Sequence, residues 1–382
     1  MRALTNCEIH TGDAVLHEHA VLLDGRRIAD VVPRGAIPPG AVIEDQHGGT
    51  LAPGFVDLHV NGGGGVMFND APTPATIALI ASAHRRLGTT DLLPTLITDV
   101  PTALAPAVEA VQACLDADVP GVLGIHLEGP FLNPRRAGVH PGRHMRRLTA
   151  GELASVPNIR RGVVLMTVAP EVADDGVIAQ AVARGIRVSA GHTDANGAQM
   201  HAAFAEGLDG GTHLLNAMRP LETREPGPVG VLLASDTAAC SLLVDGAHVH
   251  YDVVRFVHRA RPVGLLYLVS DALPVVGAPH HDAFPVGDQA VRVVDGLCTT
   301  ADGVIAGSSV ALASAMRNCV VEAGIPKAEA IRMATIYPAR YARADDRAGV
   351  IAPGRDANLV LLDDDLRVRR VIVRGEAVSA DG

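Results

Sequence analysis

The chain has 382 residues, of which 48% are hydrophobic and 19% are charged, so a large core can be buried and we expect a soluble globular protein. With a net charge of −10, 3% aromatic residues and no block rich in Lys or Arg, the sequence argues against nucleic acid as a partner. It has no apolar run long enough for a signal peptide or a membrane span, and its five cysteines are scattered without a CxxC pair, so we expect a cytoplasmic protein with reduced thiols and no membrane partner.

The first 52 residues contain short strand-like runs separated by turn signals. The runs lie at 20–23, 27–32 and 41–45, and the turn signals are Asp24-Gly25 and Pro38-Pro39-Gly40. The other end of the chain has the same character, with the runs "ANLVLLD" and "VRRVIVRGEAV". Two β-rich ends flanking a different middle part predict one small sheet domain made from both termini, which we place at 1–52 plus 344–382.

From residue 55 onward, apolar runs typical of buried strands alternate with helical segments. Strands are predicted at 55–60, 89–95, 121–127, 162–168, 186–190, 210–214, 240–244 and 265–269. Helices are predicted at 73–87, 102–117, 174–184, 195–206 and 251–261, the first with Thr73 as its cap ahead of Pro74. This alternation predicts an α/β fold, a (β/α)₈ TIM-like barrel over 53–343, and the apolar strands suit a parallel sheet covered on both faces.

Polar residues of metal-ligand type recur where the predicted strands end, which is where a barrel of this kind places its catalytic groups. They are Glu128 after the third strand, His192 after the fifth, His213 after the sixth and Asp271 after the eighth. A buried carboxylate is costly unless something positive pairs with it. Two imidazoles and one carboxylate leave an open position on a catalytic divalent ion, and Asp271 would lie beside it as a proton shuttle. A single histidine at a strand end is ordinarily a hydrogen-bonded core residue. We interpret His126 in this way, or as a residue that supports a metal ligand.

Two other features argue against a nucleotide-binding site and against a lysine that bridges metal ions. The glycine-rich run Asn61–Gly65 follows a strand, but it lacks the GxGxxG spacing and an acidic partner in a matching βαβ unit, so we expect a flexible loop at the barrel mouth. Lys327 is the only lysine, which removes a P-loop. It lies well past the eighth predicted strand, which argues against a carboxylated lysine that bridges two metal ions.

Several segments together resemble a known family. They are "LAPGFVDLHVNGGGG", "GIHLEGPFLNPRRAGVH", "SAGHTDA", "GTHLLNAMRPLETREPG" and "LVSDALP", and they are similar to the N-acetylglucosamine-6-phosphate deacetylases of the amidohydrolase superfamily. The resemblance covers nearly the whole chain. It implies a metal-dependent barrel with a small β-sandwich formed by both termini. It also implies removal of the acetyl group from N-acetyl-D-glucosamine 6-phosphate, giving D-glucosamine 6-phosphate and acetate, in amino-sugar catabolism or recycling.

The resemblance also implies roles for individual residues. It makes Glu128, His192 and His213 the metal ligands, Asp271 the catalytic acid and base, and His140 the residue that helps to hold the substrate carbonyl. The positions that match sugar-phosphate binders are Asn216, Ala217, Arg224 and His248, with Ile305 in the pocket wall. A homodimer is implied as well, in which Arg224 reaches into the neighbouring active site.

The chain departs from the superfamily in its first strand, where HxH is usual and this sequence has His59-Val60-Asn61. The departure favours one divalent ion per subunit and argues against a second ion beside His59. The His₂Glu donor set suits Zn²⁺ first, and Fe²⁺, Co²⁺ or Mn²⁺ as well. The alternatives left open are a deacetylase for N-acetylgalactosamine 6-phosphate or a related N-acyl amino sugar, and a non-catalytic barrel that binds sugar phosphates.

Overall fold

The computed structural model describes residues 1–278 and 282–378. At its centre, eight strands form one sheet in the order β17-β16-β15-β14-β13-β12-β11-β8, and every neighbouring pair is parallel. The strands are β8 (Phe55–Val60), β11 (Thr89–Ile97), β12 (Gly124–Glu128), β13 (Val163–Val168), β14 (Arg187–Ala190), β15 (Gly210–Gly211), β16 (Ala239–Leu242) and β17 (Leu266–Leu268). A parallel bridge between Val60 and Ala272 joins the end of β8 to the segment that follows β17, so the predicted barrel is confirmed.

Each predicted strand has a counterpart, and the first has the predicted bounds, whereas the other seven differ from prediction by one to three residues at an end. The sixth strand ends at Gly211 rather than at residue 214, because His213 and Leu215 have φ values of 34° and 81°, which extended backbone does not adopt. The third strand begins at Gly124 and ends at Glu128, one residue beyond the predicted end. Glu128 is therefore the last residue of its strand, whereas His192, His213 and Asp271 lie in the turns that follow theirs.

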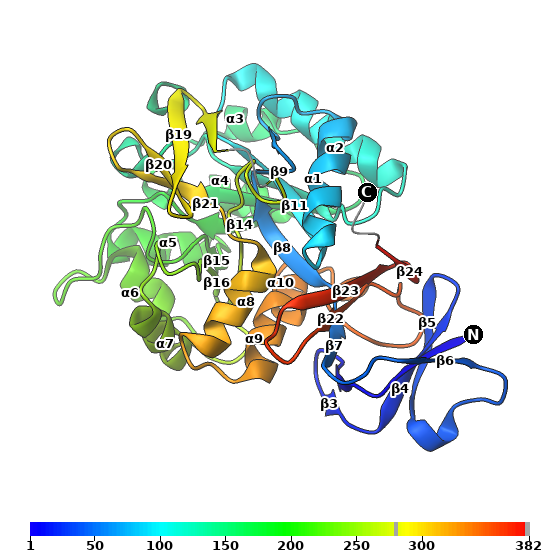
Figure 1. The fold of residues 1–382 in the computed structure, drawn as a ribbon. Coiled ribbons are helices and arrows are strands. Elements are labelled where there is room, and N and C mark those ends of the chain that lie inside the picture. Colours follow the sequence, from blue (N-terminus) through cyan, green and yellow to red (C-terminus); the bar gives the residue numbers. More distant parts are fainter. Residues whose placement is uncertain (279–281, 379–382) are drawn as a thin grey trace.

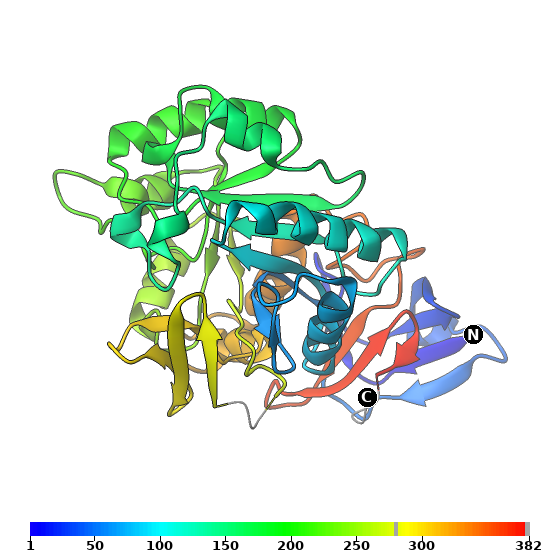
Figure 2. The same cartoon turned by 90° about the horizontal axis from the view of Figure 1, so that it is seen from above.

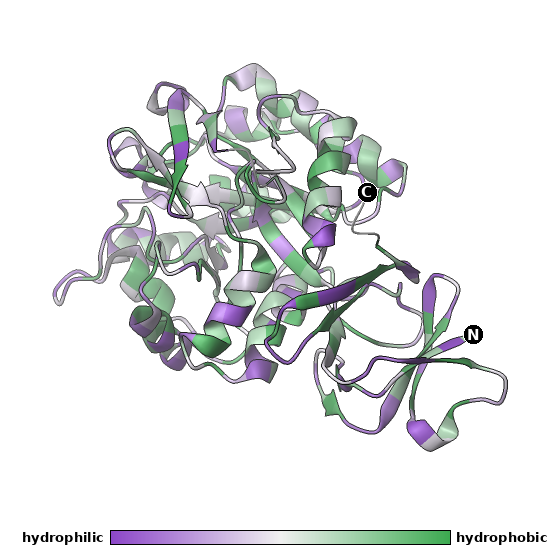
Figure 3. Cartoon of the chain, in the orientation of Figure 1, coloured by the Kyte–Doolittle hydropathy of each residue, from purple (hydrophilic) through white to green (hydrophobic). Residues whose placement is uncertain are grey.

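Helices surround this sheet, and hydrophobic residues concentrate on the strands and the inward helix faces (Figure 3). They are α1 (Pro74–Arg86), α2 (Leu104–Asp116), α3 (Ala150–Ser155), α4 (Val177–Ala183), α5 (Gly197–Ala205), α6 (Gly227–Ala234), α7 (Tyr251–Ala260), α8 (Leu312–Val321), α9 (Lys327–Ala334) and α10 (Ile336–Tyr341). The Thr73 hydroxyl accepts a hydrogen bond from the Thr76 N–H, so it caps α1 as predicted. Asn196 and Gln199 form a capping box at α5, so that helix begins two residues later than predicted.

The two ends of the chain form two sheets beside the barrel (Figures 1 and 2). One has the order β5-β4-β1-β6 and the other β24-β23-β22-β7-β2-β3. The strands are β1 (Arg2–Thr5), β2 (Glu8–His10), β3 (Val15–Leu16), β4 (His19–Asp24), β5 (Arg27–Pro33), β6 (Val42–Asp45), β7 (Thr50–Pro53), β22 (Leu359–Leu362), β23 (Val368–Val373) and β24 (Glu376–Ala377). Antiparallel pairing of β7 with β22 brings the two ends together, and one cluster that includes Leu4, Val21 and Leu359 packs between the sheets. The boundaries 1–52 and 344–382 stay predictions, and 379–382 lie outside the described residues.

A four-stranded antiparallel sheet between β17 and α8 was not predicted from the sequence. It consists of β18 (Ala283–Val286), β19 (Gln289–Val294), β20 (Leu297–Thr300) and β21 (Ile305–Ser308). Phe284 and Val286 pack there against Met67, Ile97 and Leu273 in a cluster of their own. The sheet lies across the barrel from the small domain (Figures 1 and 2).

The glycine-rich run after β8 forms a small hairpin, β9 (Gly62–Gly63) with β10 (Val66–Met67), where a flexible loop was expected. The Gly62 N–H donates to Ala272 O, and His84 donates to Gly62 O over 2.9 Å. A Cβ on Gly63 would lie 2.7 Å from His84 Nε2, so only glycine permits this approach. Within the described part of the chain, no helix combines the length and the apolar character needed to cross a membrane.

Candidate active site

A cavity of about 440 Å³ opens at the C-terminal ends of the barrel strands. Nearly all of the candidate residues identified from the sequence line it: Glu128, His140, His192, His213, Asn216, Ala217, His248, Asp271 and Ile305. The β18–β21 sheet supplies part of the wall through Val286 and Ile305. Strands from different parts of the barrel therefore deliver the predicted groups to one place.

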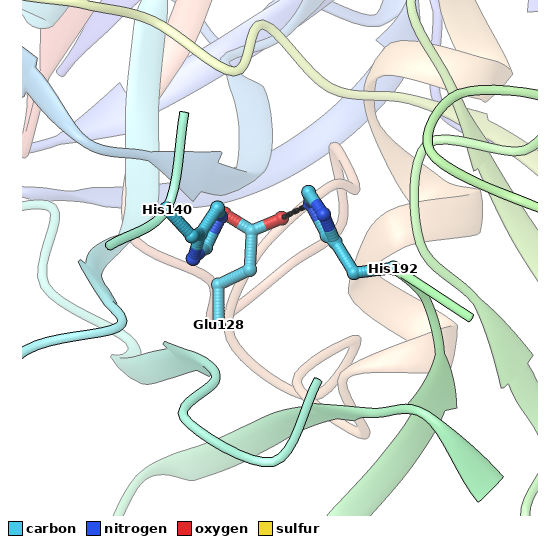
Figure 4. A group of neighbouring side chains, drawn as sticks. All are labelled: Glu128, His140 and His192. Carbon is cyan, nitrogen blue, oxygen red and sulfur yellow. Dashed lines mark hydrogen bonds and ion pairs between the residues drawn. The ribbon is translucent and has the colours of Figure 1, made fainter. Parts of the chain in front are cut away.

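Glu128 is the centre of this cluster, and Figure 4 shows the side chains of His140 and His192 pointing toward its carboxylate. Glu128 Oε1 lies 2.9 Å from His213 Nε2 and 3.2 Å from His192 Nε2. Glu128 Oε2 lies 3.0 Å from His59 Nε2 and 3.5 Å from His140 Nε2. All five side chains are buried. Burial would raise the pKa of Glu128, but the charge of His59 and the close ring nitrogens of His140, His192 and His213 hold it well below the ordinary value.

Several of these residues have unusual backbone conformations. His192, His213 and Asp271 have φ values of 46°, 34° and 51°. The left-handed region costs a non-glycine residue about 1–2 kcal/mol, and such residues often cluster at functional sites. Each of the three lies within two or three residues of the end of its strand. The sharp turn of the chain there is part of what places these side chains at the cavity.

In a neutral histidine, the hydrogen-bond partner of Nδ1 determines whether the proton is on Nδ1 or on Nε2. His192 Nδ1 lies 2.7 Å from Arg136 O, and a carbonyl only accepts hydrogen bonds, so Nδ1 carries the proton and Nε2 has a free lone pair. The Thr98 N–H donates to His140 Nδ1 over 3.3 Å, so the proton of a neutral His140 is on Nε2, which faces Glu128. His192 Nε2 can therefore offer a lone pair to a cation, and His140 Nε2 can donate a hydrogen bond.

Asp271 lies at the edge of the same cluster. Its Oδ1 is 2.6 Å from Asn61 Nδ2 and 3.0 Å from His59 Nε2. Burial would raise the pKa of Asp271, but the charge of His59 and its hydrogen bond outweigh that and lower it. Asp271 is therefore a carboxylate at neutral pH and can accept a proton. Donor atoms of His59, Glu128 and Asp271 all lie within 4.8 Å of one another, as do those of Glu128, His140 and His192.

His248 and Asp245 form a pair in the cavity wall. His248 Nδ1 lies 2.6 Å from Asp245 Oδ2, and Asp245 Oδ1 accepts from the N–H groups of Ala247 and His248 over 2.9 Å each. Burial would lower the pKa of His248, but Asp245 outweighs it, and the pKa is raised. Asp245 was not predicted as a site residue. The only sign of it in the sequence is its place three residues before His248.

Other candidate residues are not among the side chains that surround the Glu128 carboxylate. Arg224 is exposed on the loop between β15 and α6 and does not line the cavity. Asn216 Nδ2 donates to His213 O over 3.2 Å. His126 is in the core, 2.8 Å from Thr167 Oγ1 and 3.2 Å from Thr95 Oγ1, as a hydrogen-bonded core residue should be.

Comparisons with known proteins agree on the relationship of the whole chain. The model of the amidohydrolase family matches residues 50–378, and the model of the NagA composite domain matches residues 1–51. The chain is 41% identical over 330 residues to an N-acetylgalactosamine-6-phosphate deacetylase from Shewanella sp. (strain ANA-3), covering 86% of this chain and 83% of that protein. It is 35% identical over 376 residues to the N-acetylglucosamine-6-phosphate deacetylase of Haemophilus influenzae, covering 98% of each.

Solved structures show the same likeness. The N-acetylglucosamine-6-phosphate deacetylase from Pasteurella multocida has a TM-score of 0.92 at 33% identity, over 98% of this chain and 99% of that chain. A mutant of the Mycobacterium smegmatis N-acetyl-D-glucosamine-6-phosphate deacetylase, in complex with N-acetyl-D-glucosamine-6-phosphate, has a TM-score of 0.91 at 33% identity, over 99% of each chain. The likeness therefore includes both the barrel and the domain made from the termini.

The Asp245–His248 pair predicts a pH-dependent contribution to stability. Burial would raise the pKa of Asp245, but His248 lowers it from 3.8 to about 2, so this contribution is present above about pH 4 and lost as the pH falls toward 2. Because the pKa of His248 is raised above 6.5, the contribution of its protonated ring is full below about pH 6.5 and lost as the pH rises through the raised value. Asp245→Asn should therefore lower the free energy of unfolding most, by about 2 kcal/mol, between those two limits. Urea unfolding measures the effect across this range, with the exposed Asp252→Asn as control, and a loss that does not vary with pH would contradict the pairing.

Proposed function

The chain belongs to the amidohydrolase family, and we propose that it is a metal-dependent hydrolase that removes the acetyl group from N-acetyl-D-glucosamine 6-phosphate, giving D-glucosamine 6-phosphate and acetate. The observation that carries the proposal is the cluster of buried histidines around Glu128, with Asp271 at its edge. We assign the catalytic domain to 53–343 and the small domain to 1–52 plus 344–382. We place the enzyme in the cytoplasm, in amino-sugar metabolism, a location that its five free cysteines support.

Glu128, His192 and His213 are the residues that would hold the metal ion. His192 Nε2 and His213 Nε2 lie 3.2 Å apart and both face Glu128 Oε1, which suits a cation among them better than two facing ring protons. Two imidazoles and one carboxylate favour Zn²⁺, and Fe²⁺, Co²⁺ or Mn²⁺ accept the same donors. When bound, such an ion supplies Lewis-acid chemistry that makes water reactive at neutral pH and polarises the amide carbonyl.

Asp271 and His140 carry out the proton chemistry and the hydrogen bonding of the reaction. Asp271 accepts a proton from the attacking water and later delivers it to the departing amine nitrogen, so it acts first as a base and then as an acid. Its hydrogen bonds from Asn61 and His59 fix the carboxylate in place. His140 donates from Nε2 to the acetyl oxygen, where negative charge develops, because its Nδ1 accepts from the Thr98 N–H.

The rest of the cavity wall binds the sugar phosphate. Asn216, Ala217 and Ile305 contact the sugar, and His248, whose pKa is raised by the Asp245 carboxylate, binds the phosphate. Arg224 lies outside the cavity of its own subunit, so we propose a homodimer in which it completes the phosphate site of the partner subunit. Exposed apolar side chains near this region, Leu221 before α6 and Phe256 on α7, support a protein contact there.

Two alternatives rest on specific observations. A second ion beside His59 would use Glu128 and Asp271 as its other donors, which the distances allow. N-acetylgalactosamine 6-phosphate is the alternative substrate, because one relative of that activity is 41% identical to this chain. The presence of the ligand cluster and of Asp271 argues against a non-catalytic barrel.

Acetate release, measured together with metal content, tests the function. We expect the purified protein to hold one divalent ion per subunit and to release acetate from N-acetyl-D-glucosamine 6-phosphate at a higher kcat/KM than from the galacto epimer or the unphosphorylated sugar. A higher kcat/KM for the galacto epimer would move the assignment to that sugar. Two ions per subunit would support a second metal site beside His59. Failure to release acetate from either phosphorylated sugar would refute the proposed function.

Asp271→Asn should fold and bind metal but lose activity, since the amide cannot accept the proton. We expect kcat to fall by about 10²–10⁴-fold, with unchanged metal content and a melting temperature close to that of the wild type. Asp252→Asn, at an exposed position on α7, is the matched control. A variant that keeps more than a tenth of the wild-type kcat would remove Asp271 from the acid–base role.

Arg224→Ala should raise KM for the phosphorylated sugar at least about tenfold and leave the activity on the unphosphorylated sugar unchanged. Arg161→Ala, also exposed, is the control. If Arg224 acts in the partner subunit, mixing Arg224→Ala with Asp271→Asn subunits creates one complete site in each mixed dimer. About a quarter of the wild-type activity should then return at low substrate concentration. No recovery in subunits shown to exchange would place Arg224 elsewhere.

A further inference from the structure

The orientation of His192 depends on a neighbouring loop rather than on its own strand. Its backbone is in the left-handed region, at φ 46°, so its surroundings must hold it. The loop after β12 contacts it twice: Arg136 O accepts from His192 Nδ1 over 2.7 Å, and the Asn133 N–H donates to His192 O over 3.0 Å. Where that loop lies relative to the turn after β14 therefore determines where His192 Nε2 points.

Glu171 joins these two segments. It lies on η5 (Pro170–Val172), directly after β13. Its Oε1 accepts from Asn133 Nδ2 over 2.8 Å and from the Asp194 N–H over 2.6 Å. Its Oε2 accepts from Thr193 Oγ1 over 2.6 Å. One carboxylate thus binds the β12 loop on one side and the two residues that follow His192 on the other.

A second contact connects the same two segments. Arg136, whose carbonyl orients the His192 ring, donates from Nε and Nη2 to Asp194 Oδ1 over 3.0 and 2.8 Å. Glu171 and Arg136 therefore both act on Asp194, one through its backbone and the other through its side chain. A carboxylate that accepts three hydrogen bonds of 2.6–2.8 Å fixes its partners more firmly than neutral bonds would.

We propose that Glu171 is a positioning residue for the metal site: it holds the Asn133 and Thr193–Asp194 segments together so that His192 Nε2 faces Glu128. This inference rests on the proposed function, in which His192 is a metal ligand. Glu171 does not line the active-site cavity, so it acts only through these segments. Loss of the outer partners of a ligating histidine typically weakens metal affinity about 10–100-fold.

Glu206 provides a matched control. It lines the same small hollow beside the barrel as Glu171, and its carboxylate also accepts two backbone hydrogen bonds, from the Gly176 N–H over 2.8 Å and the Ala179 N–H over 3.4 Å. Those partners belong to the start of α4 and not to the ligand loops. Removal of either carboxylate should cost stability, but only removal of Glu171 should disturb the metal site.

The test measures Zn²⁺ affinity by competition with a chromophoric chelator, together with the melting temperature of each metal-free protein. Glu171→Ala should raise the dissociation constant about 10–100-fold, and Glu206→Ala should leave it within about threefold of the wild-type value. Thr193→Val removes the hydrogen bond to Glu171 at nearly constant volume, together with the one that Thr193 Oγ1 accepts from the Ala195 N–H over 3.0 Å, and should raise the constant several-fold. If Glu171→Ala fails to fold, Thr193→Val decides.

An unchanged dissociation constant in Glu171→Ala, or in Thr193→Val where that variant decides, would overturn the inference. So would equal losses of affinity in Glu171→Ala and Glu206→Ala at equal losses of melting temperature, because the effect would then follow stability alone. Absence of Zn²⁺ binding by the wild-type protein is a different result: it would refute the proposed metal site itself.

Discussion

Glu128 is a buried carboxylate with the ring nitrogens of four histidines within 3.5 Å of it, and the rest of the site is arranged around that charge. An isolated carboxylate in such a place would be protonated or would destabilise the fold. The histidines lower its pKa, and a divalent cation between the carboxylate and two of the rings would neutralise it more completely. The third barrel strand can therefore end in an acid because β8 and the turns after β14 and β15 bring histidine nitrogens to the same point.

The barrel provides this convergence through the turns after its strands. His192, His213 and Asp271 all adopt the left-handed conformation just past a strand end, and backbone hydrogen bonds to other parts of the barrel hold each turn. The Asp271 N–H donates to His59 O, and the Leu214 N–H, next to His213, donates to Ser241 O. The residues with strained backbone are thus also the ones that neighbouring parts of the barrel hold in place, as is common at functional sites.

The sequence predicted those parts of the molecule whose signal lies in consecutive or nearby residues. Apolar runs gave the eight strands, and acidic and histidine residues at their ends gave the cluster around Glu128. The β18–β21 sheet escaped prediction because its strands alternate between buried and exposed residues and lack the continuous apolar runs of the barrel strands. They pack on distant residues such as Met67 and Ile97, which no local pattern reveals. Asp245 and Glu171 escaped for a related reason: each acts through hydrogen bonds to a candidate residue or its neighbours, and nothing in their own positions marks them as functional.

His140 and His192 show why residue type alone does not assign a role. Their rings lie 4.4 Å apart, centroid to centroid, and both face Glu128. A backbone N–H at Nδ1 makes His140 a donor at Nε2, whereas a backbone carbonyl at Nδ1 leaves a lone pair on His192 Nε2, as its proposed role as a metal ligand requires. The same logic applies to Asn61, which stands where the superfamily usually has a second histidine. Its amide donates to Asp271 Oδ1, so the departure in the first strand replaces a potential metal ligand with a group that fixes the carboxylate proposed as the acid and base.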